Sequence, residues 1–368
     1  MNKKIFVVLF CIAVLAVTLM GCDNSREEEG QRTDTDNVAE TDGDFDSMRI
    51  TPTEEIQELE DGLSVVRYEG NYGFSEFLEQ GGANDDAEVA AYLMDSISAR
   101  GLNILFGGNP FGCSTLSVES ENDGYLFGRN FDWNSCDALI VSARPEEGYA
   151  SVSTVNRDFI SASGVDISSL PDNVQAIVAL YAPLDGMNEQ GLAISVNMIQ
   201  DSASIDQDTD KPDITTTTAV RLLLDQAATV EEAVELLGQY DLHASMNMMI
   251  HFALADAQGN SVVVEYIENE MHVTPTSVVT NFYLTEGEKY GIGTEQSHER
   301  YEILMERISS QESMTENEVR EALDSVSKDN FEYRFSTTEW SIVMNQETKE
   351  LTYFHRENYE NGYTIAVE

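Results

Sequence analysis

The stretch that decides the fold lies at residues 112–116, which read GCSTL, and at residues 128–133, which read GRNFDW. Residues 114–120 alternate polar and apolar side chains, as a half-buried strand does. The sequence NDG at 122–124 is a strong turn signal, and residues 125–127 begin a return strand. The pattern therefore predicts a β-hairpin that carries both quoted segments.

Cys113 is a candidate nucleophile, because such a hairpin would bring Arg129 and Asp132 back beside it. A thiol reacts as the thiolate, so it needs a base or an electropositive site. None of the five histidines stands in a papain-like or caspase-like setting. If the bond between Gly112 and Cys113 is cut, the new α-amino group, with an ordinary pKa of roughly 8, becomes the cysteine's own base. Arg129 would stabilise the thiolate, and Asp132 would accept a hydrogen bond from the α-ammonium group.

Three later segments follow the hairpin in order. Residues 186–192 read GMNEQGL, and the strand after them ends at Asn197. Asn281 lies just past an expected strand at 278–279, and Arg300 stands near the start of an expected helix. A lone asparagine at a strand end is commonly a turn former, and a lone arginine on a helix is usually solvated. Their joint order behind Cys113 indicates a site instead.

Together these segments resemble the N-terminal-nucleophile (Ntn) amide hydrolases of the choloylglycine hydrolase, penicillin V acylase and isopenicillin N acyltransferase group. In that group a cysteine is followed at the same spacing by an R-N-x-D segment. The resemblance implies an α+β fold over 113–368, a four-layer αββα sandwich with two mainly antiparallel sheets. It also implies that Asn197 and Asn281 supply oxyanion-hole donors and that Arg300 supports the electrostatics around the nucleophile. The loop at 201–212 is less similar, and we expect it to shape the substrate pocket.

The wider pattern mixes strands with helices, as expected of two sheets between helical layers. A turn is expected at 185–191, and Thr229 with Glu232 forms a capping box. Strands are expected at 63–68, 176–182, 192–197, 250–255, 261–266, 340–344 and 351–355, and helices at 86–100, 217–226, 230–240, 297–309 and 316–326.

The first 112 residues divide into three parts. Residues 1–21 read as a lipoprotein signal peptide, because the apolar run ends in LMGC and Cys22 would be lipidated; an ordinary secretory signal is the alternative. Residues 22–50 are an acidic, disordered tether. Residues 51–112 form a folded, propeptide-like segment, with an amphipathic helix that presents one apolar face. That face consists of Val89, Tyr92, Leu93 and Ile97.

The composition excludes several classes of partner. The formal net charge is −47, so nucleic acids and anionic membrane surfaces are poor partners. No phosphate-binding loop or Cys/His ligand spacing indicates a metal or nucleotide cofactor. A disulfide between Cys113 and Cys136 is an alternative that would silence the nucleophile.

The leading hypothesis is a lipid-anchored, exported hydrolase of linear, non-peptide amides, which is freed by autocatalytic cleavage between Gly112 and Cys113. Its partners would be a small-molecule amide and, through Cys22, the outer face of a bacterial cell membrane. Acyl transfer to an amine acceptor is the enzymatic alternative. A surface lipoprotein that binds an amide or peptide without turnover is the alternative from another class. The sequence does not indicate the acyl group, the amine or the oligomeric state.

Overall fold

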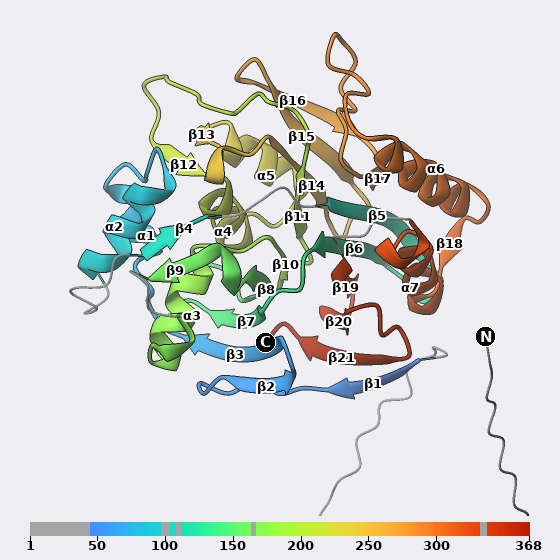
Figure 1. The fold of residues 1–368 in the computed structure, drawn as a ribbon, viewed down its shortest axis with the longest axis horizontal. Coiled ribbons are helices and arrows are strands. Elements are labelled where there is room, and N and C mark those ends of the chain that lie inside the picture. Colours follow the sequence, from blue (N-terminus) through green and yellow to red (C-terminus); the bar gives the residue numbers. More distant parts are fainter. Residues whose placement is uncertain (1–44, 97–103, 108–111, 163–166, 332–336) are drawn as a thin grey trace, which may run out of the picture. The chain divides into compact units, whose positions relative to one another are not determined.

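The predicted hairpin lies within one of two large β-sheets (Figure 1). The computed structural model describes residues 45–96, 104–107, 112–162, 167–331 and 337–368, all of which fall in one unit spanning Glu40–Glu368. Strands β5 (Gly112–Ser120) and β6 (Tyr125–Trp133) pair antiparallel around the NDG turn, where Asp123 and Gly124 have φ of 70° and 76°. Gly124 suits this left-handed backbone.

In the eight-stranded sheet, the hairpin lies beside strands from the end of the chain. β6 pairs antiparallel with β19, and β5 pairs antiparallel with the short β17 and parallel with β18. The spatial order is β1 (Asp46–Arg49), β21 (Asn361–Ala366), β20 (Glu350–His355), β19 (Thr337–Asn345), β6, β5 and β17 (Val278–Val279), with β18 (Ser313–Met314) alongside β5.

The nine-stranded sheet holds the segments that follow the hairpin, together with strands from before it. Most of its pairs are antiparallel, and β3 with β7 is parallel. The order is β16 (Glu270–Pro275), β15 (Ser261–Ile267), β14 (Ile250–Ala255), β11 (Ala193–Met198), β10 (Asp185–Asn188), β8 (Ser151–Asn156), β7 (Ala138–Arg144), β3 (Leu63–Glu69) and β2 (Gln57–Glu60).

The two sheets face each other, and helices cover their outer sides. β11 of the larger sheet packs against β5, which places the nucleophile between the sheets. Helices α6 (Glu295–Ser309) and α7 (Glu316–Ser325) pack on β5, β6 and β19. Helices α3 (Asp172–Leu180), α4 (Thr216–Gln226) and α5 (Val230–Leu237) pack on the nine-stranded sheet. The predicted four-layer αββα sandwich is confirmed (Figure 1).

The remaining elements are short. Two small sheets pair β12 (Asp213–Thr215) with β13 (Asp241–His243) and β4 (Ile104–Phe106) with β9 (Ile160–Ala162). Helices α1 (Phe74–Glu79) and α2 (Asp86–Ser96) precede the hairpin. Single 3₁₀ turns are η1 (Arg157–Phe159), η2 (Ile167–Ser169), η3 (Ser245–Asn247) and η4 (Lys328–Asn330). Within the described ranges, the helices are too short or too polar to cross a membrane.

One predicted strand is wrong. Residues 176–182 lie in and just after helix α3, which begins behind Pro171 with Asp172 in its first turn. The helix packs on β3, β7 and β8, so its apolar residues are buried in a nearly continuous run. A short apolar run reads the same in a buried helix and in a buried strand, and the alanines here favour the helix.

Two other predictions need smaller corrections. Residues 185–188, predicted as part of a turn, form strand β10, and the turn is confined to the residues before Gly191, where φ is 83°. The Asn188 side chain holds this turn by accepting from the backbone N–H groups of Gln190 and Leu192. The capping box at Thr229 is half formed: Thr229 accepts from the Glu232 N–H, but the Glu232 carboxylate accepts from the N–H of Ala228.

The segment before the hairpin is built into both large sheets. β1 pairs with β21, so the tether predicted for residues 22–50 ends earlier than expected. β3 pairs with β7 along its whole length. In α2, Val89 and Leu93 are buried and Tyr92 is half-buried; the predicted end of this helix, with Ile97, lies outside the described residues. Strand pairing therefore joins the segment before the hairpin to the rest of the fold.

Candidate active site

The two faces of the β5–β6 hairpin present different groups. Cys113 stands opposite Phe131, and Thr115 stands opposite Arg129. Because side chains alternate along a strand, Cys113 and Arg129 point to the face that meets the nine-stranded sheet. Gly112 stands opposite Asp132, whose side chain points to the face covered by α6. The hairpin thus brings both predicted partners to Cys113, one on each face.

Arg129 is fully buried between the sheets and reaches across to the larger one. Its Nε lies 2.8 Å from Oδ2 of Asp185 on β10, and both side chains have 0% exposure. Nη1 donates to Oδ1 of Asn197, and Nη2 donates to the carbonyl of Val196. The Cys113 thiol also faces the Val196 carbonyl, at 3.5 Å. Arg129 therefore provides a buried positive charge beside the sulfur.

The thiol of Cys113 is fully buried and free. Burial raises its pKa above the ordinary value, while the charges of Arg129 and Arg300 oppose that rise. In the intact chain the thiol is therefore the resting form, and a base is needed to activate it. Cys136 is also buried and free, so the alternative disulfide is not formed.

Asn197 has a free donor in this region. Its Oδ1 accepts from Arg129 and from the hydroxyl of Ser195. Its amide Nδ2 is buried and has no hydrogen-bond partner among the described residues. A buried, unpaired donor beside the nucleophile suits the predicted oxyanion-hole role.

Asn281 is placed differently from the prediction. Its Nδ2 donates to the carbonyl of Met198 at 2.6 Å, so this donor is already used. Its Oδ1 accepts from the backbone N–H of Cys113 at 2.9 Å and from Nη2 of Arg300 at 2.8 Å. The geometry favours Asn281 as the residue that holds the nitrogen of Cys113, because its oxygen rather than its NH₂ faces the site.

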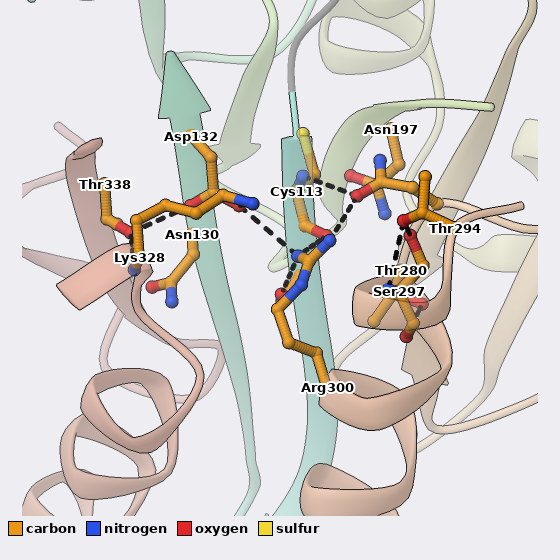
Figure 2. Close-up of polar contacts among 12 residues, drawn as sticks. Cys113, Asn130, Asp132, Asn197, Thr280, Thr294, Ser297, Arg300, Lys328 and Thr338 are labelled. Atoms are coloured by element: carbon orange, nitrogen blue, oxygen red, sulfur yellow. Dashed lines mark hydrogen bonds and ion pairs between the residues drawn. The ribbon is translucent and has the colours of Figure 1, made fainter. Parts of the chain in front are cut away.

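Arg300 joins α6 to both strands of the hairpin (Figure 2). Its Nη1 donates to the carbonyl of Cys113 and to the hydroxyl of Ser114, each at 2.6 Å. The same nitrogen lies 3.3 Å from Oδ2 of Asp132. Asp132 is 1% exposed, and its Oδ1 accepts from the hydroxyl of Thr338. The predicted contact of Asp132 with the Cys113 nitrogen is not made in the intact chain, where that nitrogen is bonded to Asn281.

Gly112 lies directly over the Asp132 carboxylate. A Cβ on this glycine would stand 2.8 Å from Oδ2 and 3.1 Å from Cβ of Asp132. Asp132 is held by its partners and has little room to give way. A glycine is therefore required at the position before the nucleophile.

A buried histidine fixes the loop that carries Asn281. One ring nitrogen of His251 lies 2.9 Å from the Glu265 carboxylate, and the other lies 2.9 Å from the carbonyl of Thr280. Burial alone would raise the pKa of Glu265, but the hydrogen bond and charge of His251 bring it to about 2. The Thr280 hydroxyl donates to the carbonyl of Ser297 in the first turn of α6 (Figure 2). His251 is thus a core residue of strand β14.

The loop at 201–212 lines a cavity of about 810 Å³ on the side of β12 and β13. His243 lies at its wall, with ring nitrogens 2.9 Å from Asp206 and from Asp213. Asp85, Asp86 and Asp208 also line it, so its surroundings are acidic. The role predicted for this loop in shaping the substrate pocket stays a prediction.

The sequence profile of the linear amide C–N hydrolases, choloylglycine hydrolase family, matches residues 113–283. This region is similar to that family. The match begins at Cys113 and includes Arg129, Asp132, Asn197 and Asn281. The resemblance predicted from the sequence is confirmed.

The chain is also similar to individual known proteins. Penicillin V acylase of Pectobacterium atrosepticum is 30% identical over 180 residues, which are 45% of this chain and 47% of that protein. The chain thus spans about half the length of this curated relative. A solved structure of a mutant conjugated bile acid hydrolase from Clostridium perfringens has a TM-score of 0.48 at 19% identity, covering 66% of this chain and 89% of that one. A solved structure of penicillin V acylase from Agrobacterium tumefaciens has a TM-score of 0.46 at 21% identity, covering 66% of this chain and 83% of that one.

Several residues of this choloylglycine hydrolase-type site are not predicted from the sequence. Asp185 directly precedes the GMNEQGL motif, and that adjacency is the signal that could have found it. Lys328 lies 3.6 Å from Asp132. Lysine is rare in this chain, with four lysines after residue 21, and that rarity is the signal that could have found Lys328. Thr338 and Glu265 carry no sequence signal, because many such residues occur on strands.

The buried pair of Arg129 and Asp185 gives a test of stability. In a Cys113→Ala background, Asp185→Asn should lower the free energy of unfolding by about 3–5 kcal/mol, because it leaves the buried guanidinium without its charged partner. Asp137→Asn is the matched control, since Asp137 is 39% exposed in its pair with Arg157. Its cost should be about 1 kcal/mol or less. Urea unfolding measures both, and equal costs for the two variants would contradict the account.

Proposed function

We propose that this protein hydrolyses linear, non-peptide amides through an acyl thioester on Cys113, with the amino group of Cys113 as the base. The observation that carries the proposal is the arrangement around one residue. The thiol faces Arg129 and the Val196 carbonyl, while the nitrogen of the same residue is bonded to Asn281. The match of residues 113–283 to the choloylglycine hydrolase family supports the same reaction class.

Cleavage between Gly112 and Cys113 is part of the proposal. The nitrogen of a peptide bond cannot accept the thiol proton, whereas a free α-amine can. The start of the family match at Cys113 supports a cut at this bond. Once free, the amine would remain next to Oδ1 of Asn281 and near the carboxylate of Asp132.

The reaction then follows from the positions of these groups. The α-amine takes the thiol proton as the sulfur attacks the amide carbonyl carbon. The carbonyl oxygen becomes an oxyanion, for which the unpaired Nδ2 of Asn197 is the available donor. Losing one such donor typically costs roughly 3–4 kcal/mol of transition-state stabilisation. The C–N bond breaks, and the α-ammonium group gives its proton to the leaving amine.

Water completes the cycle. It attacks the thioester while the α-amine takes one of its protons, the C–S bond breaks, and the free acid leaves as the thiol regains its proton. Acyl transfer is the same sequence with an amine in place of water. An exported protein would meet no pool of acyl-CoA, which disfavours a version of acyl transfer that depends on acyl-CoA.

The two buried cysteines provide a matched pair of variants. Cys113→Ala should abolish both amide hydrolysis and chain cleavage, because it removes the nucleophile. Cys136→Ala should retain both, since Cys136 lies apart from these contacts and its backbone N–H bond to Glu339 survives the change. Released amine is measured on bile-salt conjugates, penicillin V, acyl-homoserine lactones and peptide-like amides. Hydrolysis that persists in Cys113→Ala would reject the mechanism.

We also propose that the protein is exported and anchored by a lipid on Cys22, on the evidence of its signal-like start; residues 1–44 lie outside the described residues. After cleavage the lipid would remain on fragment 22–112. The pairing of β3 with β7 and of β1 with β21 would keep fragment 113–368 attached to it.

Membrane fractionation tests the anchor and the attachment together. In wild type, both fragments should sediment with the membrane under native conditions and separate in denaturing electrophoresis. Cys22→Ser should release both fragments into the soluble fraction, and Cys11→Ser should release neither. A membrane-bound 22–112 with a soluble 113–368 would show that strand pairing does not hold the catalytic fragment.

A further inference from the structure

Lys328 is a buried lysine that is linked to both oxygens of the Asp132 carboxylate, to one of them through the hydroxyl of Thr338. The side chain is 9% exposed, and its Nζ lies 3.6 Å from Oδ2. The backbone N–H of Lys328 donates to the hydroxyl of Thr338 at 3.0 Å, and that hydroxyl donates to Oδ1 at 2.8 Å (Figure 2). One residue thus reaches Oδ2 directly and Oδ1 through a single hydroxyl.

Asp132 does not need this lysine to balance its charge. Nη1 of Arg300 is already 3.3 Å from the same Oδ2. Lysine is rarely buried, and burial lowers the pKa of Lys328 while Asp132 opposes that effect and Arg300 adds to it. Three cations, Arg129, Arg300 and Lys328, therefore face two carboxylates, Asp132 and Asp185. Asp132 thus has two cations beside it, and Lys328 adds the second of them.

Lys328 lies on the carboxylate that is next to Gly112, the residue whose bond to Cys113 would be cut. Oδ2 of Asp132, which Lys328 contacts, is the atom closest to the Cβ position of Gly112. A carboxylate at this point favours the ammonium form of a new amine. A lysine that shares the carboxylate weakens that effect, and its own charge disfavours a second cation nearby. Both influences favour the neutral amine.

We propose that Lys328 is a positioning residue that keeps the amino group of Cys113 neutral, and so able to act as the base, by holding Asp132 and by adding a positive charge next to it. The inference deepens the proposed function and rests on it. The residue lies beyond the matched family region at 113–283, so the assignment comes from the contacts in this chain alone.

Other charged groups surround the same region and stay constant when only residue 328 is changed. Glu357 is the nearest additional carboxylate, since it accepts from the backbone N–H groups of Thr338 and Asp329. Comparing variants at one position therefore isolates the charge of Lys328. The charged and titratable groups that face this region are Arg129, Asp185, Arg300, Asp329, Glu357 and Tyr359.

The test compares Lys328→Met, which removes the charge, with Lys328→Arg, which keeps it. Lys349→Met is the control at a half-exposed lysine in the turn between β19 and β20. Two pH profiles are recorded on protein shown by intact mass to be cleaved: kcat/KM for amide hydrolysis, and the rate at which iodoacetamide alkylates Cys113. Lys328→Met should move the acidic limb of both profiles up by about one to two pH units, with activity recovered at higher pH. Lys328→Arg and Lys349→Met should keep the wild-type limb.

Each other outcome has a defined meaning. A Lys328→Met enzyme with an unmoved limb overturns the proposal, and so does an equal loss of activity at every pH, which a purely structural role would give. If the wild type shows no amide hydrolysis but its alkylation limb moves in Lys328→Met, the tuning stands and the proposed function fails. If Lys328→Met stays uncut, Lys328→Gln is measured in its place. An uncut chain in both would assign Lys328 to processing and overturn its role in the mature protein.

Discussion

Arg129 on β6 and Asp185 on β10 form an ion pair that crosses from one sheet to the other, at 2.8 Å and without exposure to solvent. The indole of Trp340 donates to the same Asp185 oxygen, so three strands meet at this carboxylate. Two buried charges are costly to hold apart from water and are stable only when paired with good geometry. The pair therefore fixes how the two sheets face each other where Cys113 lies. From that position Arg129 also contacts the Asn197 side chain and the Val196 carbonyl, which the thiol faces.

A second charged cluster lies on the other face of the hairpin and is built differently. Arg300 and Lys328 come from the helical layer and share Asp132. The first cluster lies beside the sulfur of Cys113, and the second lies beside its backbone, because alternate side chains of a strand point to opposite faces. The unpaired Nδ2 of Asn197 and the unpaired Nε of Arg300 are buried in this region. Groups of this kind are rare in folded proteins and concentrate where a ligand or a reacting atom completes them.

How far the sequence predicts this arrangement depends on the range of the interaction. The β5–β6 hairpin follows from local alternation and a turn that needs residues tolerant of positive φ, so its register, and with it Arg129 and Asp132, could be predicted. The prediction of a strand at helix α3 is wrong because a short apolar run does not distinguish a buried helix from a buried strand. Lys328 and Asp185 are brought to the site only by packing between distant segments, which no local pattern encodes. The role of Asn281 could not be predicted from the sequence either, because the orientation of its side-chain amide depends on the carbonyl of Met198.

The central claim is that Cys113 supplies both the nucleophile and the base, and aldehyde capture tests it most directly. An amino-terminal cysteine carries an amine and a thiol on adjacent carbons, and this pair condenses with an aldehyde to a thiazolidine ring; an internal cysteine has no free amine and cannot do so. Wild-type protein is treated with an aldehyde, and its mass and amide hydrolysis are then measured. The account predicts one adduct on the fragment that begins at Cys113, with loss of hydrolysis in step with its formation. An active, full-length chain that forms no adduct would contradict it.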